Sequence, residues 1–353
     1  MAQIPIGTQG ALVRGLLALP DPLLRPIAGR PVILDGQRLH VEVQVALKLL
    51  ALAGEEPLSG MDAGQARARV LLDARTFQGP RIEVESVREV TVSGADGPLR
   101  GRLYIPAGST EQPGSASTPG GLLVYFHGGG FVVCDLDTHD NVCRFLALHA
   151  GVRVLSVDYR LAPEHRFPAA IDDALASFRF AVEHAEELGA DPARIAVGGD
   201  SAGGNLAAGV ARLAAGNGAP ALQLLFYPWL DLTTKRPSYR LFANGFYLTE
   251  ADLDWYSRHY LADERDALDP RCSPLLAEDL SSAAQAYIVT AGFDPLRDDG
   301  EDYAAALRAA GVRAALRREP GLIHGFVNTV QVGHAAREAM LEAAGALRLA
   351  LAT

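Results

Sequence analysis

The stretch of this sequence that decides the fold is Val197-Gly-Gly-Asp-Ser-Ala-Gly-Gly204. The apolar run 194–197 before it predicts a buried strand, and the alanine-rich run 205–215 after it predicts a helix. Between them, Ser201 lies in the pattern Gly199-x-Ser201-x-Gly203. A serine in so sharp a reversal has a strained backbone, and the residues two before and two after it come too close to carry a Cβ. The pattern predicts a hydroxyl held at a helix N-terminus, where free N–H groups favour negative charge.

The same pattern also arises by chance in a chain with 36 glycines. Its alternative reading is a glycine-rich turn that Ser201 caps. The strand before it and the helix after it favour a nucleophilic serine. Residues elsewhere in the chain are needed to distinguish a nucleophilic serine from a capped turn.

Length and composition limit the function classes. With 353 residues, 49% of them hydrophobic, the chain can bury one large core. Its net charge of −10 argues against nucleic acid and anionic membranes as partners. The cysteines, Cys134, Cys143 and Cys272, have neither metal-ligand spacing nor a disulfide framework, which favours the cytoplasm and predicts no metal site. No apolar run approaches the roughly 20 residues that span a bilayer, so no stable membrane association is expected.

The remaining chain alternates strands with helices. Strands are expected at 81–95 and 98–105 (a hairpin), 122–126, 152–158, 222–227, 286–291 and 313–317, and an exposed loop at 106–121. Helices are expected near 10–19, 38–52, 169–188, 299–310 and 333–349. The alternation of strands and helices is interrupted between Trp229 and Leu280. This order predicts an α/β fold whose mostly parallel central sheet is flanked by helices.

Several chemically capable residues follow strands directly. They are Ser201, the run His127-Gly-Gly-Gly130, Asp294 and His324. Because sites in parallel sheets lie at the carboxyl ends of the strands, these residues are expected to meet at one edge.

A serine hydroxyl needs a base to take its proton. His324 follows the last strand and is the first candidate; His127, just before the glycines, is the alternative. The base needs a carboxylate to hold its tautomer. Asp294 is the first carboxylate after its strand, with Asp298 behind it, although Asp294-Pro295 is also typical of a helix N-terminus.

The order Ser201, Asp294, His324 is the one expected of an α/β hydrolase. With this order in place, the glycine run after His127 also has an expected role. The N–H groups of Gly128, Gly129 and Ala202 are expected to stabilise the oxyanion that forms from a carbonyl oxygen.

Five motifs in this order resemble the hormone-sensitive-lipase-like carboxylesterases, the bacterial family IV esterases. The motifs are His127-Gly-Gly-Gly130, Tyr159-Arg-Leu-Ala-Pro-Glu164, Gly199-Asp-Ser-Ala-Gly203, Asp294-Pro-Leu-Arg-Asp298 and His324-Gly-Phe326. The resemblance implies an α/β-hydrolase core at 80–228 and 270–353. It also implies a helical cap, made of an N-terminal part at 1–55 and an insertion at 229–269. It supports the triad Ser201, Asp294 and His324 and the oxyanion hole named above.

Members of this family commonly cleave short- to medium-chain acyl esters without a cofactor. The expected substrate is therefore a small apolar ester, with Ser201 forming an acyl-enzyme and His324 acting as general base and acid. An amidase or deacetylase would use the same triad, and a ligand receptor on this fold is the alternative from another class. An exposed edge strand near 313–317 would allow a homodimer.

Overall fold

The computed structural model describes residues 6–54, 56–108, 120–214 and 218–352. Eight strands form one sheet in the order β10-β9-β8-β7-β5-β6-β4-β3. The antiparallel part is the β3–β4 hairpin and its pairing with β6, and the other pairs are parallel. The strands are β3 (Ser86–Gly94), β4 (Gly97–Ile105), β5 (Gly120–Phe126), β6 (Arg153–Val157), β7 (Ala190–Asp200), β8 (Gln223–Phe226), β9 (Ala286–Phe293) and β10 (Ala314–Ile323).

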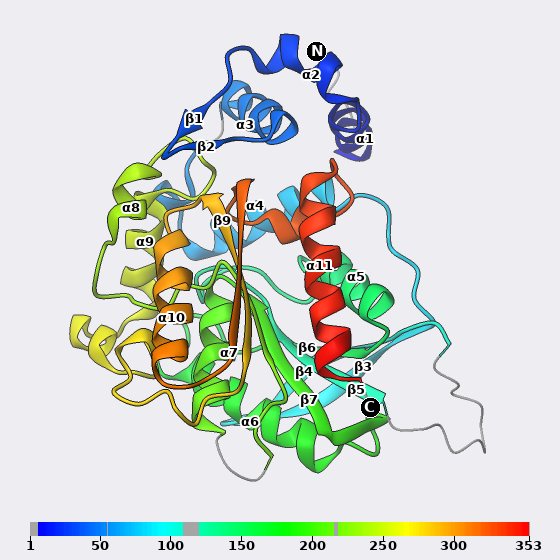
Figure 1. Cartoon of the computed structure of the whole chain (residues 1–353), viewed down its shortest axis with the longest axis vertical. Coiled ribbons are helices and arrows are strands. Elements are labelled where there is room, and N and C mark those ends of the chain that lie inside the picture. Colours follow the sequence, from blue (N-terminus) through cyan, green and yellow to red (C-terminus); the bar gives the residue numbers. More distant parts are fainter. Residues whose placement is uncertain (1–5, 55, 109–119, 215–217, 353) are drawn as a thin grey trace.

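Helices cover both faces of this sheet (Figure 1). On one face lie α5 (Asp140–Ala150) and α11 (Ala335–Ala350), which contact each other. On the other lie α6 (Ala169–Glu183), α7 (Ala202–Leu213) and α10 (Arg297–Ala309), with α6 packed on α7. The predicted α/β architecture is confirmed.

Strand β5 shows why the sheet has two cores. Leu122, Val124 and Phe126 belong to the core under α6 and α7, whereas Leu123 and Tyr125 belong to the core under α5 and α11. This alternation follows the two-residue period of a strand. All five side chains are fully buried, and each contributes roughly 1.5–3 kcal/mol of hydrophobic stabilisation.

The N-terminal elements lie over the end of the sheet at which β9 and β10 finish (Figure 1). They are α1 (Ile6–Leu17), α2 (Asp21–Ala28), the two-stranded hairpin β1 (Ile33–Leu34) and β2 (Gln37–Arg38), and α3 (Val41–Ala53). Gln37 donates to the carbonyl oxygen of Gly292, and the His40 amide donates to that of Gly321. These bonds attach the N-terminal part beside the strand ends.

The next segment was not assigned from the sequence and forms η1 (Leu58–Gly60) and α4 (Ala63–Phe77). The segment after β8 forms α8 (Pro237–Leu241), α9 (Glu250–Tyr260), η2 (Glu264–Leu268) and η3 (Pro274–Leu276). The Ser59 amide donates to Asp252, and the Trp255 indole donates to the carbonyl oxygen of Met61. Two segments distant in sequence are therefore joined.

Most of the predicted elements are found within a few residues of their expected bounds. The predicted loop at 106–121 lies outside the described residues at 109–119.

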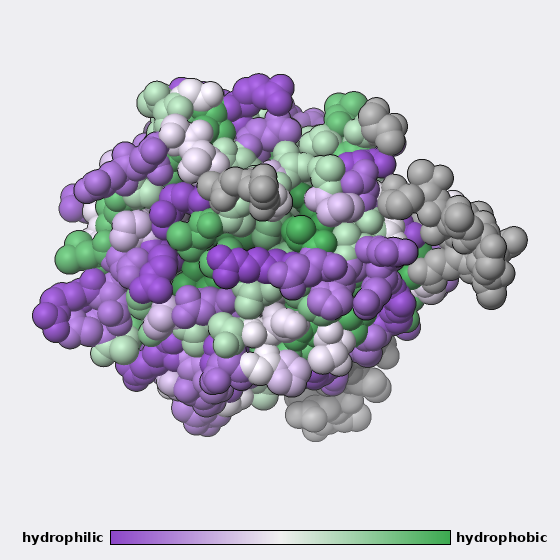
Figure 2. Space-filling view, turned by 90° about the horizontal axis from the view of Figure 1, so that it is seen from below, coloured by the Kyte–Doolittle hydropathy of each residue, from purple (hydrophilic) through white to green (hydrophobic). Residues whose placement is uncertain are grey.

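Among the helices described here, none is long and apolar enough to cross a membrane. The end of the molecule opposite α1–α3 carries mostly hydrophilic residues around smaller hydrophobic areas (Figure 2).

Candidate active site

Ser201 occupies the reversal between β7 and α7. Its backbone has φ 54° and ψ −119°, a conformation that a residue with a Cβ rarely adopts. The Ser201 amide donates to the carbonyl oxygen of Phe226 at 2.9 Å, which fixes the turn to the neighbouring strand. A Cβ on Gly199 or Gly203 would overlap the carbonyl oxygen of Phe126. The glycines of the pattern are therefore required by backbone contact, as the sequence predicted.

The structure brings Ser201, Asp294 and His324 together. The Nε2 atom of His324 lies 3.0 Å from the Oγ of Ser201, and its Nδ1 lies 2.9 Å from Oδ2 of Asp294. Asp294 follows β9 and His324 follows β10, so parallel strand ends place both beside the serine. Ser201 and His324 are 7% and 8% exposed, and Asp294 is fully buried. The site is nearly closed to solvent.

The hydrogen bonds define the tautomer of His324. A carboxylate accepts, so Nδ1 carries the proton and Nε2 offers its lone pair to the serine hydroxyl. The ring of Tyr227 packs against the imidazole, with the centroids 4.5 Å apart. The other oxygen of Asp294, Oδ1, accepts from the Leu296 amide at 2.9 Å. Asp294 thus pairs with the histidine and orders the turn before α10, but it is not the N-cap of that helix, which begins at Arg297.

In the glycine run after β5, the carbonyl groups of His127, Gly128 and Gly129 are anchored by hydrogen bonds. The oxygen of His127 accepts from the Tyr159 hydroxyl at 2.7 Å, and that of Gly128 accepts from His127 Nδ1 at 2.8 Å. The oxygen of Gly129 accepts from the amides of Val132 and Val133, both at 3.0 Å. In a trans peptide the next N–H points opposite to the carbonyl, so these bonds also direct the amides.

The expectation for Gly128 needs correction. Its amide donates to Oδ1 of Asp200 at 3.0 Å and is therefore not free for an oxyanion. By contrast, the amides of Gly129, Gly130 and Ala202 have no hydrogen-bond acceptor among the described residues. Gly129 and Gly130 have φ 106° and 58°, so the run uses backbone conformations that favour glycine.

His127, the alternative base, is held away from the serine. Its Nδ1 is used by Gly128, and its ring stacks on Tyr159 with the centroids 4.4 Å apart. Complete burial, assisted by His139, lowers the pKa of His127 to about 4. His127 is therefore a neutral part of the glycine loop.

Asp298, the alternative carboxylate, is also bound elsewhere. Its Oδ2 accepts from the Ser238 amide and its Oδ1 accepts from Nε of Arg297, both at 2.9 Å. Asp294 is thus the carboxylate that the structure pairs with His324.

Asp200, next to the serine, has a role that sequence reasoning missed. It accepts from the Tyr125 hydroxyl at 2.8 Å and from the Gly128 amide, and it lies 3.2 Å from Nε2 of His139. Burial raises the pKa of Asp200, but His139 and the Tyr125 hydrogen bond outweigh burial and hold it below its usual value. The ionised carboxylate therefore fixes the start of the glycine loop. No local pattern signals this role, because its donors lie 61 to 75 residues before it in the chain.

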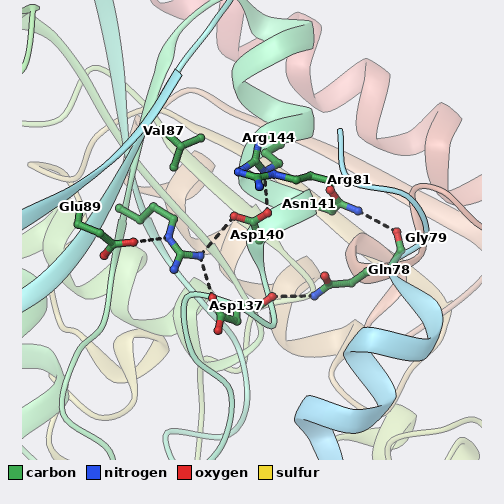
Figure 3. A pocket seen from close by; sticks show the side chains of 10 residues that line it. Gln78, Gly79, Arg81, Val87, Glu89, Asp137, Asp140, Asn141 and Arg144 are labelled. Atoms are coloured by element: carbon green, nitrogen blue, oxygen red, sulfur yellow. Dashed lines mark hydrogen bonds and ion pairs between the residues drawn. The ribbon is translucent and has the colours of Figure 1, made fainter. Parts of the chain in front are cut away.

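A separate pocket of about 470 Å³ lies between β3, β4 and the start of α5 (Figure 3). Of the three arginines that line it, two are paired within it: Arg102 pairs with Glu89, Asp137 and Asp140, and Arg144 pairs with Asp140. None of the residues that line it belongs to the Ser201 site. In the described ranges, no group of three or more His, Cys, Asp or Glu side chains is arranged to hold a metal ion.

Comparison with known proteins agrees with this arrangement. A family model described as the alpha/beta hydrolase fold matches residues 123–328. The carboxylic ester hydrolase LipN of Mycobacterium tuberculosis is 46% identical over 348 residues, which cover 95% of this chain and 90% of LipN. The chain belongs to the alpha/beta hydrolase family. The resemblance to the hormone-sensitive-lipase-like branch is thereby confirmed.

Two further similar proteins are also named as ester-cleaving or ethyl acetate hydrolases. Ethyl acetate hydrolase of Pseudomonas putida is 40% identical over 83% of this chain and 92% of its own length. Among solved structures, the ester-hydrolase EH1AB1 from the metagenome of Lake Arreo, complexed with a bipyridine phosphonate derivative, superposes with a TM-score of 0.83. It is 39% identical, over 88% of this chain and 98% of that one.

Proposed function

We propose that this alpha/beta hydrolase is a serine carboxylesterase that cleaves small apolar esters with short- to medium-chain acyl groups. The observation that carries the proposal is the hydrogen-bonded series Asp294, His324 and Ser201 beside unpartnered backbone amides. The names of LipN and the ethyl acetate hydrolase support the reaction class.

The chemistry is a two-step acyl transfer. Ser201 Oγ attacks the ester carbonyl carbon while its proton passes to Nε2 of His324. Asp294 stabilises the imidazolium, which then gives the proton to the leaving alcohol. Water activated by the same histidine hydrolyses the acyl-enzyme and releases the acid.

For the oxyanion hole we propose the amides of Gly129, Gly130 and Ala202. The bond from Gly128 to Asp200 removes the first glycine amide from the set. The anchored carbonyls aim the next two without a conformational change, which is the property an oxyanion hole requires. Each such donor contributes roughly 2.7–4 kcal/mol to transition-state stabilisation.

The division into core and cap remains a proposal. We assign 80–228 and 270–353 to the core and 1–55 and 229–269 to the cap. The bonds from Ser59 to Asp252 and from Trp255 to Met61 support treating residues 56–79 as part of the cap as well.

A homodimer through the sheet edge at β10 and a cytoplasmic location are further proposals. Strand β10 pairs with β9 on one side and ends the sheet order. The three cysteines are all free thiols, which suits a reducing compartment.

The test is hydrolysis of p-nitrophenyl esters from two to sixteen acyl carbons, with the matching anilides, by the wild type and Ser201→Ala. We expect turnover of short and medium esters over anilides, and a loss of at least about a thousandfold in the variant. Near-normal turnover by Ser201→Ala would overturn the assignment, and preference for anilides would indicate an amidase.

A further inference from the structure

Helix α4 lies along the loop that carries the glycine run and binds it at both ends. At the C-terminal end, Gln78 donates to the carbonyl oxygens of Asp137 and Thr138, and Asn141 donates back to the oxygen of Gln78 at 3.0 Å (Figure 3). At the N-terminal end the contact is made by Arg67. The loop between β5 and α5 is thus held by a helix from a distant part of the chain.

The Arg67 guanidinium joins three groups. Its Nε donates to the carbonyl oxygen of Val132 at 2.8 Å, and its Nη2 donates to that of Ala162 at 2.9 Å. Both terminal nitrogens also bind the carboxylate of Glu164, at 2.9 and 2.6 Å. The hydrogen bond from Arg67 lowers the pKa of Glu164 to about 2, so this ion pair is formed at neutral pH.

Val132 in turn controls an amide of the proposed oxyanion hole. The Val132 and Val133 amides hold the carbonyl oxygen of Gly129. That oxygen and the Gly130 N–H belong to one planar trans peptide and point in opposite directions. A shift of the Val132–Val133 segment therefore turns the Gly130 N–H away from the oxyanion.

We propose that Arg67 is a positioning residue for the oxyanion hole: from helix α4 it holds Val132 in place and so fixes the direction of the Gly130 amide. The proposal rests on the proposed function. It makes the docking of a cap helix a condition for catalysis, and it assigns a role in turnover to a side chain that does not touch the substrate.

The principal variant is Arg67→Met, which keeps much of the apolar stem and loses every donor. We expect kcat to fall about 10–100-fold with KM within about threefold of wild type. The loss is smaller than the roughly 10²–10³-fold cost of deleting a donor, because the amide is displaced and not removed. Arg67→Lys, which can still donate to a carbonyl, is expected to recover part of kcat.

Two further variants separate this role from general stabilisation. Glu164→Gln removes the ion pair but leaves both carbonyl contacts of Arg67, and we expect kcat within about threefold of wild type. Arg88→Met is the matched control, since Arg88 on β3 also donates to a backbone carbonyl, that of Glu187, at 2.8 Å. It is expected to leave kcat unchanged. Active-site titration with a phosphonate corrects all rates for the fraction of folded enzyme.

The deciding measurement is inhibition by a trifluoromethyl ketone, which adds to the serine and places an oxyanion in the hole. Across the Arg67 variants its Ki is expected to rise in proportion to the fall in kcat/KM, while Ki for an unreactive ether analogue of the substrate stays constant. An Arg67→Met enzyme with wild-type kcat, or with only a raised KM, would overturn the proposal. So would equal losses in Glu164→Gln. Activity retained by Ser201→Ala would instead defeat the proposed function itself.

Discussion

Replacing Asp294 by Asn tests the assignment of the site most sharply, because the structure indicates which way the amide will turn. In the native protein Oδ1 of Asp294 accepts from the Leu296 amide and Oδ2 accepts from His324 Nδ1. Asn has one acceptor, and the buried Leu296 amide requires it. The NH2 group of the new side chain therefore faces His324.

This orientation reverses the tautomer of the imidazole. Nδ1 has to accept from the Asn amide, so the proton moves to Nε2 and points at Ser201 Oγ. A histidine that is protonated there has no lone pair to take the serine proton. We expect kcat to fall about 10⁴-fold, as for the same change in a Ser-His-Asp protease, which corresponds to about 5.4 kcal/mol of transition-state stabilisation.

The assay is kcat for a short p-nitrophenyl ester at pH 7 to 9, with the melting temperature as a check on folding. Asp298→Asn is the matched control, and we expect it to retain kcat within about threefold, because Asp298 contacts Ser238 and Arg297 and not His324. An Asp294→Asn enzyme that keeps more than a tenth of wild-type kcat would refute the reasoning. A larger loss in Asp298→Asn than in Asp294→Asn would show that the wrong carboxylate had been chosen.

Three further predictions concern the glycine loop and the N-terminal part. Gly130→Ala places a Cβ inside the ring of Tyr256, so kcat/KM is expected to fall at least about 100-fold in ester hydrolysis; Gly311→Ala, also at positive φ but in open space, should keep full activity. Because the pKa of buried His127 is about 4 against a usual 6.5, the unfolded chain binds more protons in that window, and the native state loses stability as the pH falls through it. Urea unfolding at pH 7 and 4 should show a loss about 3 kcal/mol larger in the wild type than in His127→Asn, and equal losses would contradict this. Glu42 accepts the His334 and Ala335 amides at the start of α11, so Glu42→Ala should lower the free energy of unfolding by about 1–2 kcal/mol; an unchanged urea midpoint would rule this out.

The sheet and the serine site could be predicted because their signals are local. Ser201, Asp294 and His324 each stand at the end of an apolar run, and a parallel sheet brings such ends together. Each of these three residues could be identified from the sequence that directly flanks it.

Helix α4 was missed for a physical reason. Its buried side chains are only Ala63 and Ala66, so it has no apolar stripe of the usual width. A signal was nevertheless present, since Asp62-x-x-Gln65 forms a capping box in which each side chain bonds to the backbone of the other residue. Arg67 could not be assigned from sequence, because its carbonyl partners lie about 65 and 95 residues along the chain.

The sequence also could not show which of the three glycine amides are free to bind the proposed oxyanion. Three consecutive glycines are equivalent in sequence, and the Asp200 carboxylate distinguishes the first from the other two by binding its amide. Asp200 ends β7 and precedes Ser201, while the glycines follow β5, the strand paired with β7. One carboxylate thus ties the nucleophile to the loop that would hold the oxyanion. A change that moves either strand end therefore moves both groups together, and the distance between nucleophile and oxyanion donors is set by the pairing of β5 with β7.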